Sequence, residues 1–331
     1  MIVVTGGAGF IGSAIVWALN LRGYNEILIV DLLDKSKKWE NLACLKFSDS
    51  IDKDEFIEKL YQGKFCDKID AVIHMGAESS TTVYETDYLM KNNYEYTKKL
   101  AMWCIKNDKR FVYASSAATY GNGDEGFCDE HLQLEKLRPL NPYADSKHLF
   151  DLWAYRQGLL EKIAGLKFFN CFGPNEYHKE SMKSMVLQAF EQIKKNGKVK
   201  LFKSFNTQYK DGEQLRDFIY VKDAADMTLF IFENKKVNGI FNIGTGKAQS
   251  FNELVNSVFG AMGKDSNIAY IDMLESIKDK YQYFTQADMG KLKDAGYIKK
   301  THTLKEAVYD YVKNYLLKDN SYLKINNISF S

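Results

Sequence analysis

Short, mostly apolar runs alternate with amphipathic stretches through the first half of the chain. The apolar runs, which are rich in β-branched residues, occupy positions 2–4, 27–30, 71–73, 111–114 and 163–169. Polar or glycine-rich residues bound each run, which is typical of buried strands. Helical patterns fall between the runs, at positions 13–19, 52–60, 88–106 and 143–157. Strands that alternate with helices in this way predict an α/β fold around a parallel sheet.

A glycine-rich turn joins the first strand to the first helix. Gly6 permits a tight turn, Gly9 allows a ligand to approach the backbone, and Gly12 allows the helix to pack closely on the strand. The free N–H groups at the start of the helix then suit a pyrophosphate. The second strand ends in Asp31, about 20 residues further on, where an acid that binds a ribose is expected. We therefore predict a Rossmann-like doubly wound parallel sheet that binds a dinucleotide, with a smaller mixed α/β substrate-binding domain.

The length of 331 residues is sufficient for two lobes. We expect a dinucleotide-binding domain at residues 1–170, to which residues 213–240 return. Residues 171–212 and 241–318 are expected to form the substrate-binding domain. The polar residues 319–331 are expected to be a tail, with disorder as one interpretation.

Composition excludes several classes of protein. The formal net charge of +2 at pH 7 gives no strong field for nucleic acid or membrane. No apolar run approaches the length of a membrane span, and the first strand begins at residue 2, so we expect neither a membrane anchor nor a signal peptide. The five cysteines are scattered without a C-x-x-C pair, which predicts reduced thiols, no metal site and a cytoplasmic location.

Candidate catalytic residues follow the strand at 111–114. Ser116 comes at the carboxyl end of this strand, where ligands bind in open α/β sheets. Tyr143 and Lys147 are four residues apart and share one helix face. A phenol has a pKa near 10, and a nearby ammonium group and a positively charged cofactor ring would lower that pKa toward neutrality. Tyr143 would then act as a general base on a hydroxyl, which Ser116 would hold by a hydrogen bond.

These motifs together resemble the extended short-chain dehydrogenase/reductases, many of which act on nucleotide sugars. The resemblance includes the turn at 5–12, the Ser116–Tyr143–Lys147 set, and the segments at 215–223 and 239–246. It covers residues 1 to about 290, although Phe172 stands where the family usually has tyrosine. Within the family, the segments at 79–82, 114–121, 178–182 and 284–288 are similar to those of nucleotide-sugar epimerases.

The resemblance implies NADP as cofactor, with NAD as the alternative. A nucleotide sugar would be oxidised to a keto intermediate and reduced again, in a homo-oligomer that is a pentamer by the same resemblance. Asp31 favours the free 2′-hydroxyl of NAD, and Lys37, Lys38 and Lys53 would offset its repulsion of a 2′-phosphate. The residues implied to line the cofactor are Gly6, Gly9, Phe10, Ile11, Gly12, Asp31, Leu32, Lys38, Lys53, Met75, Gly76, Ala77, Glu78, Ser79, Asn92, Lys147, Cys171 and Lys179.

The same resemblance implies a substrate site and a second catalytic base. Arg216 would bind the substrate pyrophosphate, to which a guanidinium is well matched. Lys179 would serve the stereoisomer that Tyr143 does not reach. The residues implied to line the substrate are Ser116, Asn170, Ser181, Gln188, Leu201, Phe202, Lys203, Ser204, Arg216 and Tyr281. Gln188 stands where that family often has a histidine, which leaves its role open.

Three alternatives remain at this point. A dehydratase or a 4-epimerase of the same family has the same catalytic set, but dehydratases usually have an Asp-Glu pair where this chain has Ala117 and Ala118. A non-catalytic protein that senses the cofactor tends to lose the Tyr/Lys pair, which this chain keeps. A scaffold role would leave three matching catalytic residues without explanation.

Overall fold

The structure is a computed structural model that describes residues 1–32, 37–80, 85–273, 278, 281–319 and 321–325. In this part of the chain, seven strands form a parallel sheet in the order β10-β6-β5-β4-β1-β2-β3. The strands are β1 (Ile2–Thr5), β2 (Ile27–Asp31), β3 (Asp49–Asp52), β4 (Ala71–His74), β5 (Arg110–Ser116), β6 (Ala164–Phe168) and β10 (Gly239–Ile243). The predicted doubly wound parallel sheet is confirmed.

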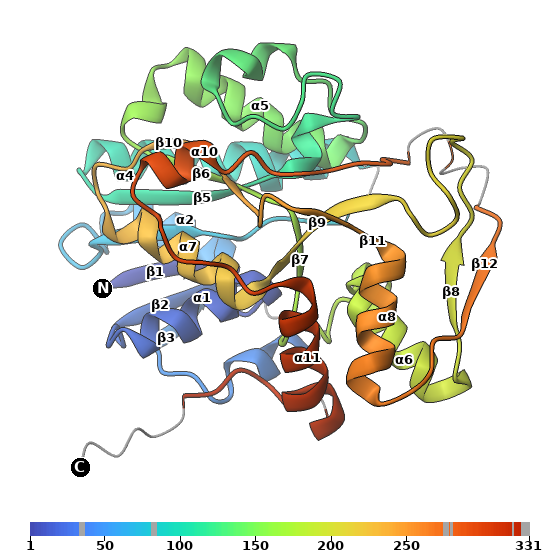
Figure 1. Ribbon diagram of the computed structural model, residues 1–331. Helices are drawn as coiled ribbons and strands as arrows, with labels where there is room; N and C mark the ends of the chain where they lie inside the picture. Colours follow the sequence, from blue (N-terminus) through green and yellow to red (C-terminus); the bar gives the residue numbers. More distant parts are fainter. Residues whose placement is uncertain (33–36, 81–84, 274–277, 279–280, 320, 326–331) are drawn as a thin grey trace.

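Helices cover both faces of this sheet. The helices α1 (Phe10–Leu21) and α7 (Val221–Glu233) pack together on one face (Figure 1). The helices α2 (Lys53–Tyr61), α4 (Tyr96–Lys106) and α5 (Pro142–Arg156) belong to the other layer. Apart from the edge strand β3, which is largely exposed, the strands are buried nearly throughout, because a parallel sheet between two helical layers has little surface open to water.

Two smaller sheets lie to one side of the large one (Figure 1). One joins β7 (Asn170–Phe172), β9 (Leu215–Tyr220) and β11 (Ala248–Ser250), and the other pairs β8 (Val199–Phe202) with β12 (Ile268–Ile271). The helices α6 (Met185–Asn196), α8 (Phe251–Met262) and α11 (Leu304–Asn314) pack beside them, with α8 between the other two. The short helix α10 (Gly290–Asp294) lies against β10.

Two of the predicted domain boundaries fall inside strands, at residue 170 in β7 and at residue 240 in β10, and the third, at residue 213, lies just before β9. Strand β9 lies in the three-stranded sheet, and the chain returns to the large sheet only with α7. Strand β10 lies in the large sheet over its whole length, across the expected boundary at residue 240. The division of the chain into two domains stays a prediction.

The expected helix at 88–106 is divided into three. It comprises α3 (Thr86–Leu89), a π-helical segment η2 (Met90–Glu95) and α4. π-Helical turns occur frequently at functional sites, and η2 carries Asn92 and Asn93. The 3₁₀ segments are η1 (Lys37–Leu42), η3 (Ala117–Tyr120), η4 (His131–Lys136), η5 (Leu159–Glu161), η6 (Glu180–Met182) and η7 (Leu316–Lys318). None of the described helices is long and apolar enough to cross a membrane.

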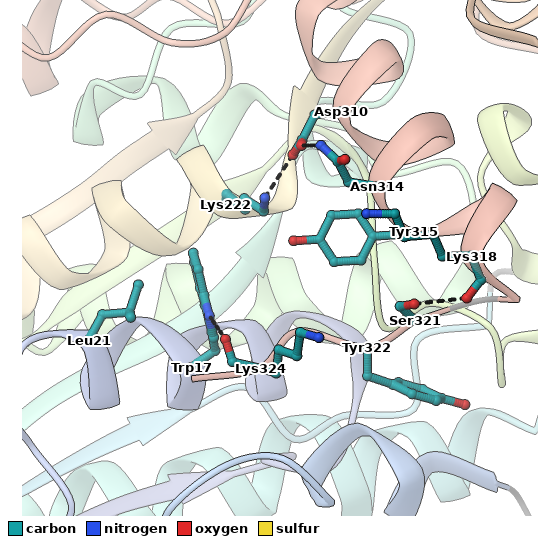
Figure 2. Close-up of a pocket in the computed structure, with 10 residues that line it drawn as sticks. All are labelled: Trp17, Leu21, Lys222, Asp310, Asn314, Tyr315, Lys318, Ser321, Tyr322 and Lys324. Atoms are coloured by element: carbon teal, nitrogen blue, oxygen red, sulfur yellow. Dashed lines mark hydrogen bonds and ion pairs between the residues drawn. The ribbon is translucent and has the colours of Figure 1, made fainter. Parts of the chain in front are cut away.

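The C-terminal segment 321–325 packs on the body of the protein, which the polar character of the tail did not predict. Leu323 is fully buried, and its backbone N–H donates to Asn175 Oδ1 at 2.9 Å. Trp17 of α1 donates to the carbonyl of Lys324 at 3.2 Å. A groove of about 440 Å³ lies between this segment, α1, α7 and α11 (Figure 2). None of its lining residues belongs to the predicted cofactor or substrate sites. Residues 326–331 of the expected tail lie outside the described residues.

Candidate active site

The turns after β1 and β4 lie against each other. Gly6 has φ +64°, and a Cβ atom there would lie 2.6 Å from the backbone nitrogen of Gly76. A Cβ at Gly12 would lie 2.0 Å from the carbonyl oxygen of Gly6. Two hydrogen bonds join the turns, because Thr5 accepts from Met75 N at 3.0 Å on its carbonyl and from Gly76 N at 3.2 Å on its hydroxyl. Only glycine fits these positions, so the backbone forms the close cradle that a pyrophosphate needs.

Asp31 lies beside this cradle at the end of β2. Its carboxylate accepts from the backbone of Ala8 at 2.9 Å and of Leu32 at 2.8 Å. Lys38, at the start of η1, forms an ion pair with the same carboxylate at 2.9 Å. The register of β2 and β3 brings Asp31 opposite Asp52, so Lys53 begins α2 nearby. Residues 33–36, between Leu32 and Lys37, lie outside the described residues.

The ammonium groups of Lys38 and Lys53 have different partners. Lys38 directly balances the charge of Asp31, whereas Lys53 forms an ion pair with Asp54 at 3.0 Å. The expectation that lysines offset the repulsion of a 2′-phosphate therefore rests mainly on Lys38. Leu32 and Lys37 are exposed on either side of the undescribed residues.

The loop after β4 is held by an asparagine that the predicted site residues do not include. Asn93 of η2 is fully buried, accepts from Glu78 N at 2.9 Å and donates to Glu78 O at 3.0 Å. It also donates to the hydroxyl of Ser146 on α5 at 3.1 Å. The predicted residue Asn92 donates to Asn93 Oδ1 at 3.1 Å. Asn93 thus links the predicted cofactor loop at 75–79 to α5. The two polar residues Asn92 and Asn93 in the middle of a predicted helix were the sequence signal for this role. Residues 81–84, which include Thr81 and Thr82 of the segment at 79–82, lie outside the described residues.

Ser116, Tyr143 and Lys147 come together at the carboxyl end of β5. Asn141 caps α5 by accepting from Ala144 N at 2.9 Å, so Tyr143 lies in the first turn of the helix. Its hydroxyl makes a side-chain hydrogen bond with Ser116. Lys147 is buried one turn later and donates to the carbonyl of Ala114 at 2.8 Å.

The electrostatics of this group differ from the expectation in one respect. Burial raises the pKa of the Tyr143 phenol, the hydrogen bond with Ser116 opposes that increase, and the carboxylate of Glu78 adds to it. Burial lowers the pKa of Lys147 to about 8, and the carboxylate of Asp151 opposes this decrease. The side chains around Tyr143 therefore do not bring its pKa toward neutrality by themselves. The lowering would have to come from the positive charge of an oxidised nicotinamide.

Lys179 lies beside the start of the first helix. Its ammonium group is 5.3 Å from the centre of the Phe10 ring, and Phe10 is the first residue of α1. It is also close to Cys171, where burial raises the pKa of the thiol and Lys179 opposes that effect. The structure thus places three predicted cofactor residues, Phe10, Cys171 and Lys179, in one group.

The residues before Lys179 fix its loop to other parts of the fold. Asn175 donates to the hydroxyl of Ser13 on α1 at 2.9 Å. The buried carboxylate of Glu176 accepts from Ser184 N at 2.6 Å. The ring nitrogen Nδ1 of His178 lies 3.3 Å from Asn41 Nδ2 on η1. The backbone that carries Lys179 is therefore held to both the cofactor helix and the segment that carries Lys38.

Arg216 and Tyr281 form a second predicted group. The guanidinium of Arg216 is largely buried, and it lies 5.3 Å from the Tyr281 ring centre and 5.7 Å from that of Phe251. Burial lowers the pKa of Arg216, and Tyr281 opposes this. The ring of Phe202 lies 6.4 Å from that of Tyr281, edge to face. Gln282, which was not predicted, accepts from Arg216 on its carbonyl and donates from its side chain to the carbonyl of Gly121. It links the Arg216 group to the turn that follows Ser116.

The other predicted substrate residues are more scattered. Leu201 is buried in β8, Lys203 forms an ion pair with Asp272 at 3.2 Å, and Ser204 N donates to Asp211 at 2.8 Å. The side chain of Gln188 on α6 donates to the carbonyl of Lys183 at 2.7 Å. Asn170 and Ser181 are exposed, at the start of β7 and on η6.

Comparison with known proteins identifies the family. Residues 2–244 match the model of the NAD dependent epimerase/dehydratase family. The chain belongs to this family. Its cofactor is therefore a nicotinamide dinucleotide, which agrees with the glycine cradle and with Asp31 at the end of β2.

Two curated relatives and one solved structure are similar over nearly the whole chain. A protein of Nitratidesulfovibrio vulgaris named ADP-L-glycero-D-manno-heptose-6-epimerase is 50% identical over 316 residues, which cover 96% of this chain and 98% of that protein. A protein of Fusobacterium nucleatum with the same name is 50% identical over 332 residues, with coverage of 98% and 100%. The crystal structure of the Helicobacter pylori enzyme of that name has 27% identity, a TM-score of 0.78 and coverage of 95% for both chains.

Proposed function

We propose that this member of the epimerase/dehydratase family converts ADP-D-glycero-D-manno-heptose to ADP-L-glycero-D-manno-heptose. The reaction would invert C6 through a 6-keto intermediate, with NADP as cofactor, in the synthesis of the lipopolysaccharide core precursor. The names of relatives with 50% identity over nearly the full length support the substrate. The observation that supports the chemistry is the meeting of Ser116, Tyr143 and Lys147 at the end of β5. The enzyme would work in the cytoplasm as a homo-oligomer, a pentamer by family resemblance.

In this proposal, Tyr143 takes the proton of the C6 hydroxyl and Ser116 holds the oxygen by a hydrogen bond. The bound nicotinamide supplies the acceptor and donor of hydride. Lys147 holds the nicotinamide ribose and keeps a positive charge beside the phenol. The protein's own contribution is thus a base whose phenolate form depends on a loaded cofactor site, because burial alone raises the pKa of Tyr143.

Inversion poses a geometric requirement that one tyrosine does not meet. Hydride leaves the substrate toward one side of the pocket and returns from that same side. For inversion, the keto intermediate must therefore turn the other face of its carbonyl group toward that side. Its oxygen then points away from Tyr143, and a second acid is needed at the new position. We assign this role to Lys179, which projects toward the start of α1 from a loop that is held on several sides.

Arg216 and Tyr281 would bind the ADP end of the substrate. A guanidinium matches phosphate oxygens by charge and by geometry. The guanidinium lies between two aromatic rings, which limits its motion and prepares it for one orientation. Through Gln282 this group is connected to the turn after Ser116, so the position of the pyrophosphate would be coupled to that of the reacting carbon.

NADP is the cofactor that the Asp31–Lys38 pair favours in this proposal. A bare carboxylate would repel a 2′-phosphate, and the ammonium group of Lys38 at 2.9 Å neutralises it. Extraction of the nucleotide that copurifies with the protein, followed by chromatography, tests this assignment. Recovery of NAD alone would refute it.

The substrate is tested by a turnover screen with ADP-, UDP- and GDP-sugars, including the two ADP-heptoses. Proton NMR of the products reports the configuration at each carbon. We expect interconversion of the two ADP-heptoses and no loss of water. Turnover of another nucleotide sugar, or formation of a dehydrated product, would instead support another epimerase or a dehydratase of the same family. Cofactor binding without any turnover would favour a sensing role.

A further inference from the structure

A fully buried ion pair lies directly behind the catalytic group. Lys167 of β6 and Asp151 of α5 are 3.2 Å apart, and their side chains are 1% and 0% exposed. Taking two charges out of water is costly, and such a pair often stabilises a fold no better than apolar residues would. The proposed chemistry uses neither residue. Their presence in the core therefore points to a task other than stability.

The carboxylate of Asp151 joins the two elements that carry the catalytic residues. It accepts from the Tyr113 hydroxyl at 2.9 Å and from the Ser115 hydroxyl at 2.6 Å, both on β5. These residues flank Ala114, whose carbonyl accepts from Lys147. Asp151 follows Lys147 by four residues on α5, so it lies on the same face of the helix one turn further along.

Lys167 reaches the other side of the same group. Its ammonium donates to the Thr119 hydroxyl, and that hydroxyl donates to the carbonyl of Ser116 at 2.7 Å. The ammonium also lies 4.7 Å from the centre of the Tyr120 ring. A continuous buried chain of contacts thus runs from the backbone of Ser116 through Lys167 and Asp151 to the strand residues beside Lys147.

We propose that Asp151 and Lys167 are positioning residues of the Ser116–Tyr143–Lys147 group: Asp151 fixes β5 to α5 and balances the charge of Lys147, and Lys167 balances Asp151. The proposal rests on the proposed function, because it assumes that this group performs the reaction. It assigns a role to two residues that touch neither substrate nor cofactor. The ion pair sets both the geometry and the charge state of Lys147.

Titratable groups surround this cluster on several elements, including His131 of η4, whose pKa is lowered to about 4 by burial. On β4 and α5, His74 and His148 are neutral, because burial lowers the pKa of His74 well below its ordinary value and that of His148 to about 4. Asp129 acts on Lys167, and burial raises its pKa to about 6. Glu78 faces Tyr143 from the loop after β4. The strongest local charge on Lys147 is thus the carboxylate of Asp151.

Substitution of Asp151 and substitution of Lys167 should shift the pKa of Lys147 in opposite directions. In Asp151→Asn, the Lys147 ammonium loses its attractive charge and faces the unbalanced Lys167, so it gives up its proton at lower pH. In Lys167→Met, the carboxylate of Asp151 acts on Lys147 alone, so the proton is held to higher pH. A role in stability alone would not produce shifts of opposite sign.

The test is the pH dependence of kcat/KM with the nucleotide sugar that the wild type turns over. We expect the alkaline limb to move down by about one pH unit or more in Asp151→Asn and up in Lys167→Met. Asp223→Asn is the matched control, because Asp223 is a buried carboxylate on α7 that pairs with His302 at 2.8 Å. Its profile should match the wild type. Shifts of the same sign in the two variants, or no shift, would overturn the proposal.

Two further variants test the positioning role if one of the single-substitution variants does not fold. The double variant Asp151→Leu/Lys167→Met removes both charges, which buried sites tolerate better than one unpaired charge. The alkaline limb of its pH profile should stay close to that of the wild type. Its kcat should fall by about 10- to 100-fold, because Ser116, Tyr143 and Lys147 are positioned less well. Ser115→Ala keeps the ion pair and cuts one link, and it should lower kcat without a shift. Wild-type kcat in both variants would refute the positioning role.

A wild-type protein without turnover of any nucleotide sugar would contradict the proposed function and leave this inference open to test. Lys147 is expected to hold the nicotinamide ribose, so its titration also appears in the pH dependence of NADPH binding, followed by fluorescence. The same opposite shifts are expected there. Their absence from a protein that binds NADPH would overturn the inference alone.

Discussion

Substitution of Lys38 by alanine tests how the protein distinguishes NADP from NAD. In the structure, the Lys38 ammonium is 2.9 Å from Asp31 Oδ1, and the two side chains are 16% and 9% exposed. Asp31 keeps two backbone donors, Ala8 N and Leu32 N, when Lys38 is removed. The variant would therefore present to the 2′-phosphate a carboxylate that has no neighbouring ammonium group.

The magnitude follows from the type of contact that is lost. A hydrogen bond to a charged group in a mostly buried site contributes about 1.5–3 kcal/mol, which corresponds to a change in Kd of about 10- to 150-fold. We therefore expect Lys38→Ala to weaken NADPH binding by about that factor. Binding of NADH should change by only about threefold or less, since its 2′-hydroxyl can donate to Asp31 without help from the lysine.

Fluorescence titration with NADPH and NADH, on protein stripped of bound nucleotide, measures both constants. Lys59→Ala is a suitable control, because Lys59 pairs with Glu55 on the surface of α2 and is remote from Asp31 in the chain. Lys53→Ala should have a smaller effect than Lys38→Ala, because its ammonium pairs with Asp54. An equal loss of affinity for both nucleotides, or no loss for either, would show that the Asp31–Lys38 pair does not select the cofactor.

Three further predictions concern catalysis and stability. Tyr143→Phe should retain the fold and the cofactor but lose about 10²- to 10⁴-fold in kcat, because it removes the acid–base group; steady-state rates within a few-fold of the wild type would exclude Tyr143 from the mechanism. Lys179→Met should stop epimerisation while one face of a carbonyl analogue still exchanges hydride with the cofactor, and product NMR showing both epimers at the normal rate would contradict the two-base mechanism. Leu323→Ala should reduce the free energy of unfolding by about 2–5 kcal/mol, because the side chain is fully buried; an unchanged denaturant midpoint would mean that the C-terminal segment is not anchored in solution.

The large sheet and the grouping of Ser116, Tyr143 and Lys147 could be predicted because both are encoded locally. The apolar runs at 2–4 and 27–30 and the glycines at 6, 9 and 12 define strand, turn and helix within a short stretch. Tyr143 and Lys147 are one helical turn apart, so their common face follows from the spacing alone. The contacts of Tyr143 with Ser116 and of Lys147 with Ala114 need only that β5 and α5 are neighbours.

Features that depend on distant partners were not predictable. Asn93 lies inside a predicted helix, and its importance comes from Glu78 and Ser146, which the sequence does not place beside it. Leu323 is a single apolar residue in a polar segment, and its burial depends on Asn175, which is 148 positions earlier. Lys167 is a charged residue inside an otherwise apolar strand, and this departure from the pattern was a signal in the sequence. Lys167 was nevertheless not among the predicted site residues, and its partner Asp151 is known only from the structure.

The anchoring of the C-terminal segment has a consequence for the order in which the protein acquires its structure. Residues 321–325 leave the ribosome after every element to which they bind. Tyr322 donates to Glu40, which is 282 positions earlier, and Trp17 donates to Lys324 across 307 positions. Contacts of such separation form late, since the cost of closing the intervening chain must be met first. The cofactor lobe can therefore begin to fold during synthesis, while the segments that carry Lys38 and Lys179 receive their last fixed contacts only when translation has passed residue 325.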